Sequence, residues 1–279
     1  QNIEITLEAN PTSSEAEKFK SFAYAGVNRF SIGLQSPDGR DLEFLGREHN
    51  KDEALRAIDA ARGVTGNVSL DLIYGLPGQD LTRWQNNLET LAALGTPHIS
   101  CYQLTIEKNT KFYADMNKGR LTPASDGVQA DFYHVTNRVL TRAGFAQYEV
   151  SNYAKGGAVC QHNSHIWRYG SYMGIGAGAH GRTRQQDGTL MATRNYKMPE
   201  KYIAQVENAG HGRYEIQTVS PDEQVTEAAL LGLRLTEGLP RARLQSLGGQ
   251  PADTYLNQDG ITLMTTNGFL APENQTTLT

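Results

Sequence analysis

The sequence contains very little cysteine and no long apolar run. Cys101 and Cys160 are its two cysteines, and they lie far apart along the 279 residues. This scarcity argues against a disulfide framework and against a sulfur-rich metal site built from this chain alone. No apolar stretch approaches the length of a membrane-spanning helix, and the first residues show neither a basic nor an apolar signal region. We therefore expect a cytoplasmic protein without a membrane span.

An excess of positive charge is also missing. The chain has 26 lysines and arginines against 30 acidic residues, which gives a net charge of −4. Since a broad nucleic-acid surface needs a basic excess, we expect no nucleic-acid partner. A local basic pocket for a small anionic ligand remains compatible with this charge. The length and the 38 % content of hydrophobic residues fit a globular protein of one or two domains.

Strand-like and helical segments alternate along the first hundred residues. Ser13 or Ser14 could cap the first helix, and Gly26 could end it. Because short links join the segments, we expect parallel strands with right-handed crossovers, and hence an α/β fold with a partial parallel (β/α) barrel. An antiparallel sheet with one wet face is the alternative, which the intervening helices disfavour. The expected strands are 3–9, 27–35, 67–75 and 98–105, and the expected helices are 14–25, 38–45, 51–62 and 80–94.

The remaining chain predicts a smaller C-terminal domain of α+β or helical type. We expect helices at 127–143, 196–208 and 222–236, a strand at 147–154, and a glycine- and histidine-rich segment at 155–181. The tail, 240–279, shows short-helix and hairpin signals, including a turn at Asn267-Gly268. We place the domain boundary between residues 183 and 184, so that the domains are 1–183 and 184–279.

The expected barrel strands have one apolar face and one small, polar face. An ordinary closed barrel fills its centre with valine, isoleucine and leucine. A polar inner face instead predicts an open barrel whose centre holds a ligand. The apolar set is Phe30, Ile32, Leu34, Val68, Leu70, Leu72 and Tyr74, and the opposite set includes Glu8, Ser31, Gly33, Gln35, Ser69 and Asp71.

Four polar side chains near the ends of these strands are candidate ligand contacts. Glu8, Gln35 and Asp71 share the polar face, where they could bind hydroxyl or amino groups. Arg47 could pair with a ligand carboxylate. The structural alternatives are that Glu8 caps a helix or meets an arginine, and that Arg47 is a solvated surface charge. Asp71 is harder to explain structurally, because an unpaired buried carboxylate is costly.

The order of motifs along the chain resembles the HemN/HemW group of radical-SAM proteins. This group contains oxygen-independent coproporphyrinogen III dehydrogenase and the HemW heme chaperone. The resemblance implies an incomplete parallel barrel that holds S-adenosylmethionine (SAM) over a [4Fe-4S] cluster, followed by a HemN-type C-terminal domain. It also implies that Glu8, Gln35, Arg47 and Asp71 contact SAM. The motifs are EITLEANP, GVNRFSIGLQS, LGREH, DLIYGLPGQ, HISCYQLTIE, QYEVSNYA, HNSHIW and GIGAGAHG.

Two family motifs do not occur, and the resemblance implies that one of them, a GGTPS-like strand end, meets the SAM amino group. The CxxxCxxC run that ligates the cluster is absent, and Cys101 and Cys160 have the wrong spacing to replace it. The family pattern places Gln1 near the third barrel strand. We therefore expect a truncated chain, with a degenerate paralogue as the alternative, and we expect no cluster and no radical from these residues alone.

The HNSHIW segment (162–167) resembles the HNxxYW element of the HemW branch. The resemblance implies heme contacts from His162, Asn163 and Trp167, with His162 as a possible axial ligand of the heme iron. Ile166 replaces the tyrosine of that element and removes a hydroxyl, and His165 is an extra candidate ligand. The structural alternative is a hydrogen-bonded loop histidine.

GIGAGAHG contains the letters GxGxxG, but a polar, non-helical segment follows, so we reject dinucleotide binding. Three functions remain open. The first is a HemW-type chaperone that binds heme and passes it to recipient proteins. The second is the dehydrogenase, which removes carbon dioxide from porphyrinogen propionates. The third is an inactive fragment. Enzyme activity is left open.

Overall fold

A computed structural model describes residues 3–12, 17–271 and 277–278. Contacts divide the chain into two compact units, Gln1–Val159 and Cys160–Thr279. The predicted boundary at 183/184 stays a prediction. None of the helices in the described ranges is long and apolar enough to cross a membrane.

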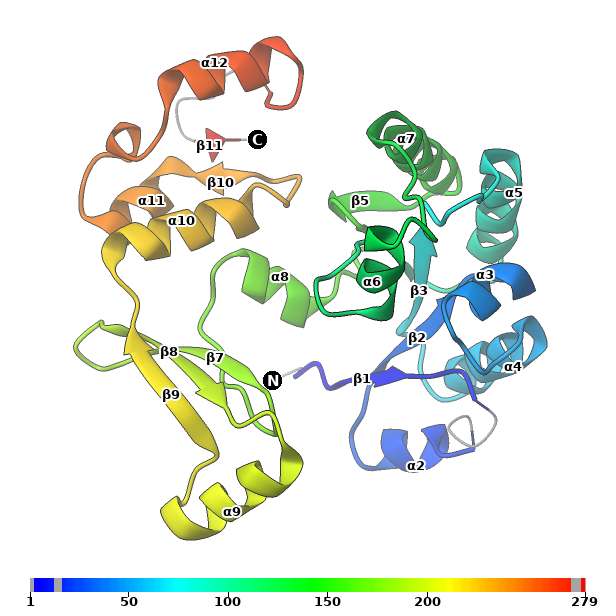
Figure 1. The fold of residues 1–279 in the computed structure, drawn as a ribbon, viewed down its shortest axis with the longest axis horizontal. Helices are drawn as coiled ribbons and strands as arrows, with labels where there is room; N and C mark the ends of the chain where they lie inside the picture. Colours follow the sequence, from blue (N-terminus) through cyan, green and yellow to red (C-terminus); the bar gives the residue numbers. More distant parts are fainter. Residues whose placement is uncertain (1–2, 13–16, 272–276, 279) are drawn as a thin grey trace. The chain divides into compact units, whose positions relative to one another are not determined.

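A six-stranded sheet forms the centre of the first unit (Figure 1). The first four strands pair in parallel, which confirms the predicted βα pattern. The last two strands are antiparallel additions at one edge. In sheet order the strands are β1 (Thr6–Ala9), β2 (Arg29–Gln35), β3 (Val68–Tyr74), β4 (His98–Gln103), β6 (Asn152–Ala154) and β5 (Ala146–Glu149).

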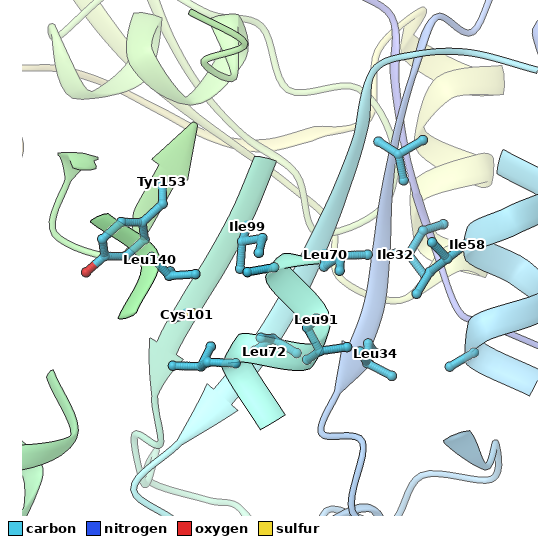
Figure 2. Close-up of a cluster of buried hydrophobic side chains, with 14 of the residues drawn as sticks. Ile32, Leu34, Ile58, Leu70, Leu72, Leu91, Ile99, Cys101, Leu140 and Tyr153 are labelled. Atoms are coloured by element: carbon cyan, nitrogen blue, oxygen red, sulfur yellow. The ribbon is translucent and has the colours of Figure 1, made fainter. Parts of the chain in front are cut away.

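Helices cover the apolar face of this sheet and create one large core. Figure 2 shows aliphatic side chains of β2, β3 and β4 lined up beside α4, α5 and α7 residues. Burying each such side chain contributes about 1.5–3 kcal/mol before conformational entropy is subtracted. The predicted apolar faces are therefore confirmed. The helices of this unit are α2 (Phe19–Tyr24), α3 (Gly39–Phe44), α4 (Lys51–Arg62), α5 (Leu81–Ala92), α6 (Lys111–Asn117) and α7 (Asp126–Arg142).

Local side-chain bonds explain where helix α4 begins. The Asn50 side chain accepts from the backbone N–H of Glu53, and the Glu53 carboxylate accepts from the backbone N–H of Asn50. This capping box satisfies two backbone donors that a helix start leaves open. The predicted caps Ser13 and Ser14 lie outside the described residues.

The predicted strand 147–154 is wrong in detail, because it is a hairpin of β5 and β6. Glu149 makes the reversal: its Oε2 accepts from the backbone N–H of Ser151 at 2.9 Å and from Nδ2 of Asn152 at 2.6 Å. Helix α6 was not predicted either. Thr110 caps it by accepting from the N–H of Tyr113, but none of its side chains is buried, so the sequence lacks a clear apolar stripe there.

The second unit packs helices against an antiparallel sheet of three strands (Figure 1). Its core joins Leu190 and Ala192 of the sheet to Val225 and Ala228 of α10 and to Leu244 of α11. The strands are β7 (His180–Arg184), β8 (Leu190–Asn195), β9 (Arg213–Thr218), β10 (Leu239–Pro240) and β11 (Thr277–Leu278). The helices are α8 (Gln161–Trp167), α9 (Pro199–Ala209), α10 (Pro221–Gly232), α11 (Arg241–Gly248), η1 (Ala252–Thr254) and α12 (Gln258–Thr266).

The hairpin expected around Asn267-Gly268 is wrong. The preceding residues form helix α12, and Gly268 ends it in the left-handed region with a φ of 74°. The N–H of Phe269 bonds to the carbonyl of Met264 at 2.9 Å, which is the pattern of a glycine-terminated helix. The same Asn-Gly pair serves helix ends and hairpins, so the pair alone does not distinguish them.

Candidate functional site

The face of the parallel sheet opposite the core is polar. Strand register places Glu8 beside Ser31, Ser31 beside Ser69, and Ser69 beside His98. Paired residues in neighbouring strands point to the same face. The row therefore crosses four strands without an aliphatic side chain, and the sequence predicted this polar face for the first three of them.

Asp71 lies on this face and is held by hydroxyl groups. Ser31 Oγ donates to Asp71 Oδ2 at 2.8 Å, and Ser69 Oγ approaches Oδ1 at 3.4 Å. Burial raises the pKa of Asp71, and the negative charge of Glu8 raises it further, whereas the bonds from Ser31 and Ser100 lower it. After accepting from these hydroxyls, the carboxylate oxygens keep lone pairs that could accept from a ligand hydroxyl or amine.

His98 is fully buried beside Asp71 and stays neutral. Its Nδ1 lies 2.7 Å from Ser69 Oγ, and its Nε2 lies 2.8 Å from the Tyr148 hydroxyl. Burial lowers the pKa of His98 to about 3, and the charge of Arg29 lowers it too. When Ser69 donates to Asp71, Nδ1 carries the proton and Nε2 accepts from Tyr148. The sequence did not single out His98, although it occupies a polar-face position of β4.

Gln35 ends strand β2 in a strained conformation. Its φ is 64°, in the left-handed region that favours glycine, and the ladder with β3 is irregular between Ile32 and Gln35. A Cβ built on Gly33 would meet Gln35 Nε2 at 2.8 Å. The amide therefore lies over Gly33, on the polar face. Strain of this kind costs about 1–3 kcal/mol and tends to occur at functional positions.

Arg47 lies apart from the buried polar row, on an exposed loop after α3. It lines a pocket of about 240 Å³ together with Asn10 and Thr12, which follow β1, and with Gly46, Glu48 and His49. His49 fixes this loop, because its Nε2 lies 3.2 Å from the carbonyl oxygen of Leu34. The structure thus places Glu8, Gln35 and Asp71 on one face and Arg47 beside the end of β1.

Arg29 is a polar-face residue that the sequence reasoning missed. It is buried, and its Nε has no hydrogen-bond partner within the described chain. Its charge lowers the pKa of Asp71. Arg29 is two residues before Ser31, so strict alternation along β2 was the signal that could have found it.

Helix α8 presents the predicted heme residues. His162 is exposed, and Asn163 and Trp167 are half-buried. Cys160 caps the helix through its sulfur, which accepts from the backbone N–H of Asn163 at 3.5 Å. The guanidinium of Arg234 lies 5.9 Å from the Trp167 ring centre, within cation–π range.

His165 has a structural role on the same helix. Its Nε2 lies 2.8 Å from the carbonyl oxygen of Ser171. A Cβ on Gly170 would lie 2.2 Å from the His165 ring, so the ring packs directly on that glycine. These contacts give His165 a structural role in positioning the loop that follows α8.

The cysteines do not fit an iron–sulfur cluster. Neither cysteine forms a disulfide, and both are buried. Burial raises the pKa of Cys101, which suppresses the thiolate that binds metal. Within residues 3–12, 17–271 and 277–278, no three histidine, cysteine or acidic side chains gather to hold a metal ion. The described residues therefore provide a ligand face without a cluster site.

Two family profiles match the chain. The radical SAM superfamily profile matches residues 1–91, and the HemN C-terminal domain profile matches residues 219–276.

Curated relatives extend this similarity over most of the chain. The chain is 39 % identical over 270 residues to radical S-adenosyl methionine domain-containing protein 1, mitochondrial, of Danio rerio, covering 92 % of this chain and 61 % of that protein. It is also 39 % identical to the heme chaperone HemW of Escherichia coli over 260 residues, covering 92 % and 66 %. The chain thus spans less than two thirds of the length of these relatives.

A solved structure shows the same fold. Coproporphyrinogen III oxidase (HemN) from Escherichia coli, a radical SAM enzyme, superposes with a TM-score of 0.76 at 17 % identity, covering 98 % of this chain and 65 % of that one. Profiles, relatives and fold agree with the family that the order of the motifs indicated. The chain belongs to the HemN/HemW group of the radical-SAM superfamily.

Proposed function

We propose that this chain is the SAM- and heme-binding portion of a HemW-type heme chaperone. The observation that carries the heme proposal is that one short helix, α8, displays an exposed His162 together with half-buried Asn163 and Trp167. A neutral imidazole is a common axial ligand of heme iron. Relatives named heme chaperone HemW, at 37–39 % identity, support the same assignment.

The neighbours of His162 suit a flat, apolar ring. Trp167 supplies an aromatic surface, and Asn163 supplies an amide, both half-buried on the same short helix. Ile166 stands where the family element has tyrosine, so any hydroxyl contact of that residue is lost. The proposal therefore rests on coordination by His162 and on ring contacts by Trp167.

The polar sheet face would hold SAM. Asp71 and Glu8 offer carboxylate acceptors for ribose hydroxyls or the amino group, Gln35 offers an amide, and Arg47 could pair with the methionine carboxylate. SAM supplies a reactive sulfonium when it is bound. The residues of this chain bind and orient it, and no cluster-dependent step is assigned to them, because the described cysteines do not fit a cluster.

A heme titration tests the chaperone proposal. We expect His162→Ala to shift the Soret band and to weaken heme binding by at least tenfold, since an axial bond to iron is lost. His134→Ala, which removes an exposed histidine of α7, is the matched control and should bind heme like the parent protein. An unchanged Soret band and unchanged affinity in His162→Ala would refute axial ligation.

Oxidative decarboxylation of coproporphyrinogen is the competing activity in this family. We expect little turnover in that assay, and robust turnover would favour the dehydrogenase. The cytoplasmic location and the transfer of heme to recipient proteins stay predictions.

A further inference from the structure

The GIGAGAHG segment forms the wall of a pocket in the second unit. This pocket of about 530 Å³ is lined by residues of β7 and β8, of α9 and of the loop that follows α9. Its size is typical of small-molecule sites. Its lining includes Met173, Ile175, Thr193, Tyr202, His211 and Arg213.

Hydrogen bonds hold the glycine-rich wall in place. Asn195 Nδ2 donates to the carbonyls of Gly174 and Gly176 at 3.2 and 2.9 Å, and the Tyr202 hydroxyl accepts from the N–H of Gly176 at 3.1 Å. A Cβ on Gly174 would lie 2.1 Å from the carbonyl oxygen of His180. The segment then enters strand β7 rather than a helix, which differs from a dinucleotide-binding loop. The motif therefore builds a fixed pocket wall.

The part of the lining that follows α9 is also close-packed. Gly210 ends α9 with a φ of 73°, and a Cβ on Gly212 would lie 2.0 Å from the Tyr202 ring. The loop between them carries His211, whose Nδ1 is buried and has no hydrogen-bond partner within the described chain. A buried polar atom without a partner costs about 1–3 kcal/mol, so the imidazole is held beside the pocket at an energetic cost.

The lining combines positive charge with apolar surface. Arg213 and His211 contribute basic groups, and none of the described lining residues is acidic. Met173 and Ile175 are 72 % and 81 % exposed, which is unusual for large apolar side chains and leaves them available for contact. The chemistry suits an anion with an apolar body, because carboxylates bind guanidinium and imidazole N–H groups.

We propose that this pocket binds the carboxylate edge of a porphyrin, with a propionate at Arg213 and His211 and the ring against Met173 and Ile175. The assignment rests on the proposed heme function and adds a site that recognises the porphyrin itself rather than its iron. Recognition of carboxylates by Arg213 would operate with or without a metal in the ring.

Iron-free protoporphyrin IX is the probe that separates this site from His162, because it has no iron to coordinate. We expect the protein to bind it with quenching of porphyrin fluorescence. Arg213→Gln should weaken this binding by roughly tenfold or more, as expected for one lost charge-assisted contact. His211→Gln should weaken it in the same direction. Arg142→Gln, an exposed arginine of α7, is the matched control and should leave binding unchanged.

Axial ligation by His162 and porphyrin binding in the pocket at Arg213 can be refuted independently. His162→Ala should leave the affinity for iron-free protoporphyrin unchanged, and Arg213→Gln should leave the Soret position of bound heme unchanged. The dimethyl ester, which lacks free carboxylates, should bind the parent protein and Arg213→Gln equally. No binding of iron-free protoporphyrin, or equal affinity of the parent protein and Arg213→Gln for it, would overturn the pocket assignment.

Discussion

Asp71 has a stability cost and lies on the face where we propose that SAM binds. Its carboxyl group is buried on the polar face, and burial raises its pKa from the usual value of 3.8. The folded protein therefore holds the proton of Asp71 more tightly than the unfolded chain does. The resulting contribution to stability is fully present below pH 3.8 and is lost as the pH rises through the folded-state pKa. Burial of Asp71 therefore lowers the stability of the folded protein as the pH rises above 3.8.

The variant Asp71→Asn tests this conflict. It keeps an acceptor for the Ser31 hydroxyl and removes the charge, so we expect a higher Tm than that of the parent protein at neutral pH. The difference in Tm between Asp71→Asn and the parent protein should vanish as the pH falls to 3.8. SAM binding, measured by calorimetry, should weaken at the same time if Asp71 binds a ligand hydroxyl or amine.

Asp131→Asn is the matched control, because Asp131 is an exposed carboxylate of α7. It should change neither Tm nor SAM affinity appreciably. A lower Tm for Asp71→Asn at neutral pH would contradict the stability cost assigned to Asp71.

At the scale of secondary-structure elements, Gly75 allows strand β3 and helix α7 to pack closely together. Gly75 follows β3 with a φ of 75°, and its carbonyl accepts from Gln129 Nε2 at 3.2 Å. Its N–H donates to Gln79 Oε1 at 2.8 Å. A Cβ at Gly75 would lie 1.9 Å from Gln129 Oε1, so the close approach of strand and helix depends on glycine.

A comparison of Gly75→Ala with Gly119→Ala distinguishes the cost of losing the contact with Gln129 from the cost of backbone strain. Gly119 has a φ of 68°, but nothing lies within 4 Å of a Cβ there. We expect Gly119→Ala to cost about 1–2 kcal/mol from the left-handed backbone alone. Gly75→Ala should cost a further 1–3 kcal/mol or so, because Gln129 must move and lose its buried bond. Urea denaturation gives both values, and equal losses would show that the contact with Gln129 is worth nothing.

Helices α4 and α8 show which elements the sequence could predict and which it could not. Helix α4 was predicted at 51–62 and observed at Lys51–Arg62, because its cap, apolar stripe and following glycine all agree. Helix α8 was missed because its cap is the sulfur of Cys160, which propensity rules do not include. Alternation along the strands predicted the polar face correctly. The bonds from Ser31 to Asp71 and from Ser69 to His98 depend on strand register, which one sequence does not supply.

At the scale of the whole chain, the two compact units have separate hydrophobic cores. The first unites the parallel sheet with α4, α5 and α7, and the second unites β8 with α10 and α11. Ile32 and Leu244 are both fully buried, one in each core. Since a core contributes mainly to the elements packed on it, local stability should divide along the same line.

Substituting one core residue by alanine in each unit tests whether local stability divides in this way. We expect Leu244→Ala to cost about 2–5 kcal/mol through the lost contacts and the cavity left behind. Native-state hydrogen exchange should then quicken for the amides of α10 and α11 while those of β2 and β3 keep their protection. Ile32→Ala should give the converse pattern, which makes each variant the control for the other. If either variant lowers the protection of both sets of amides equally, the two cores unfold as one cooperative unit. The two hydrophobic cores would then not be separate units of stability.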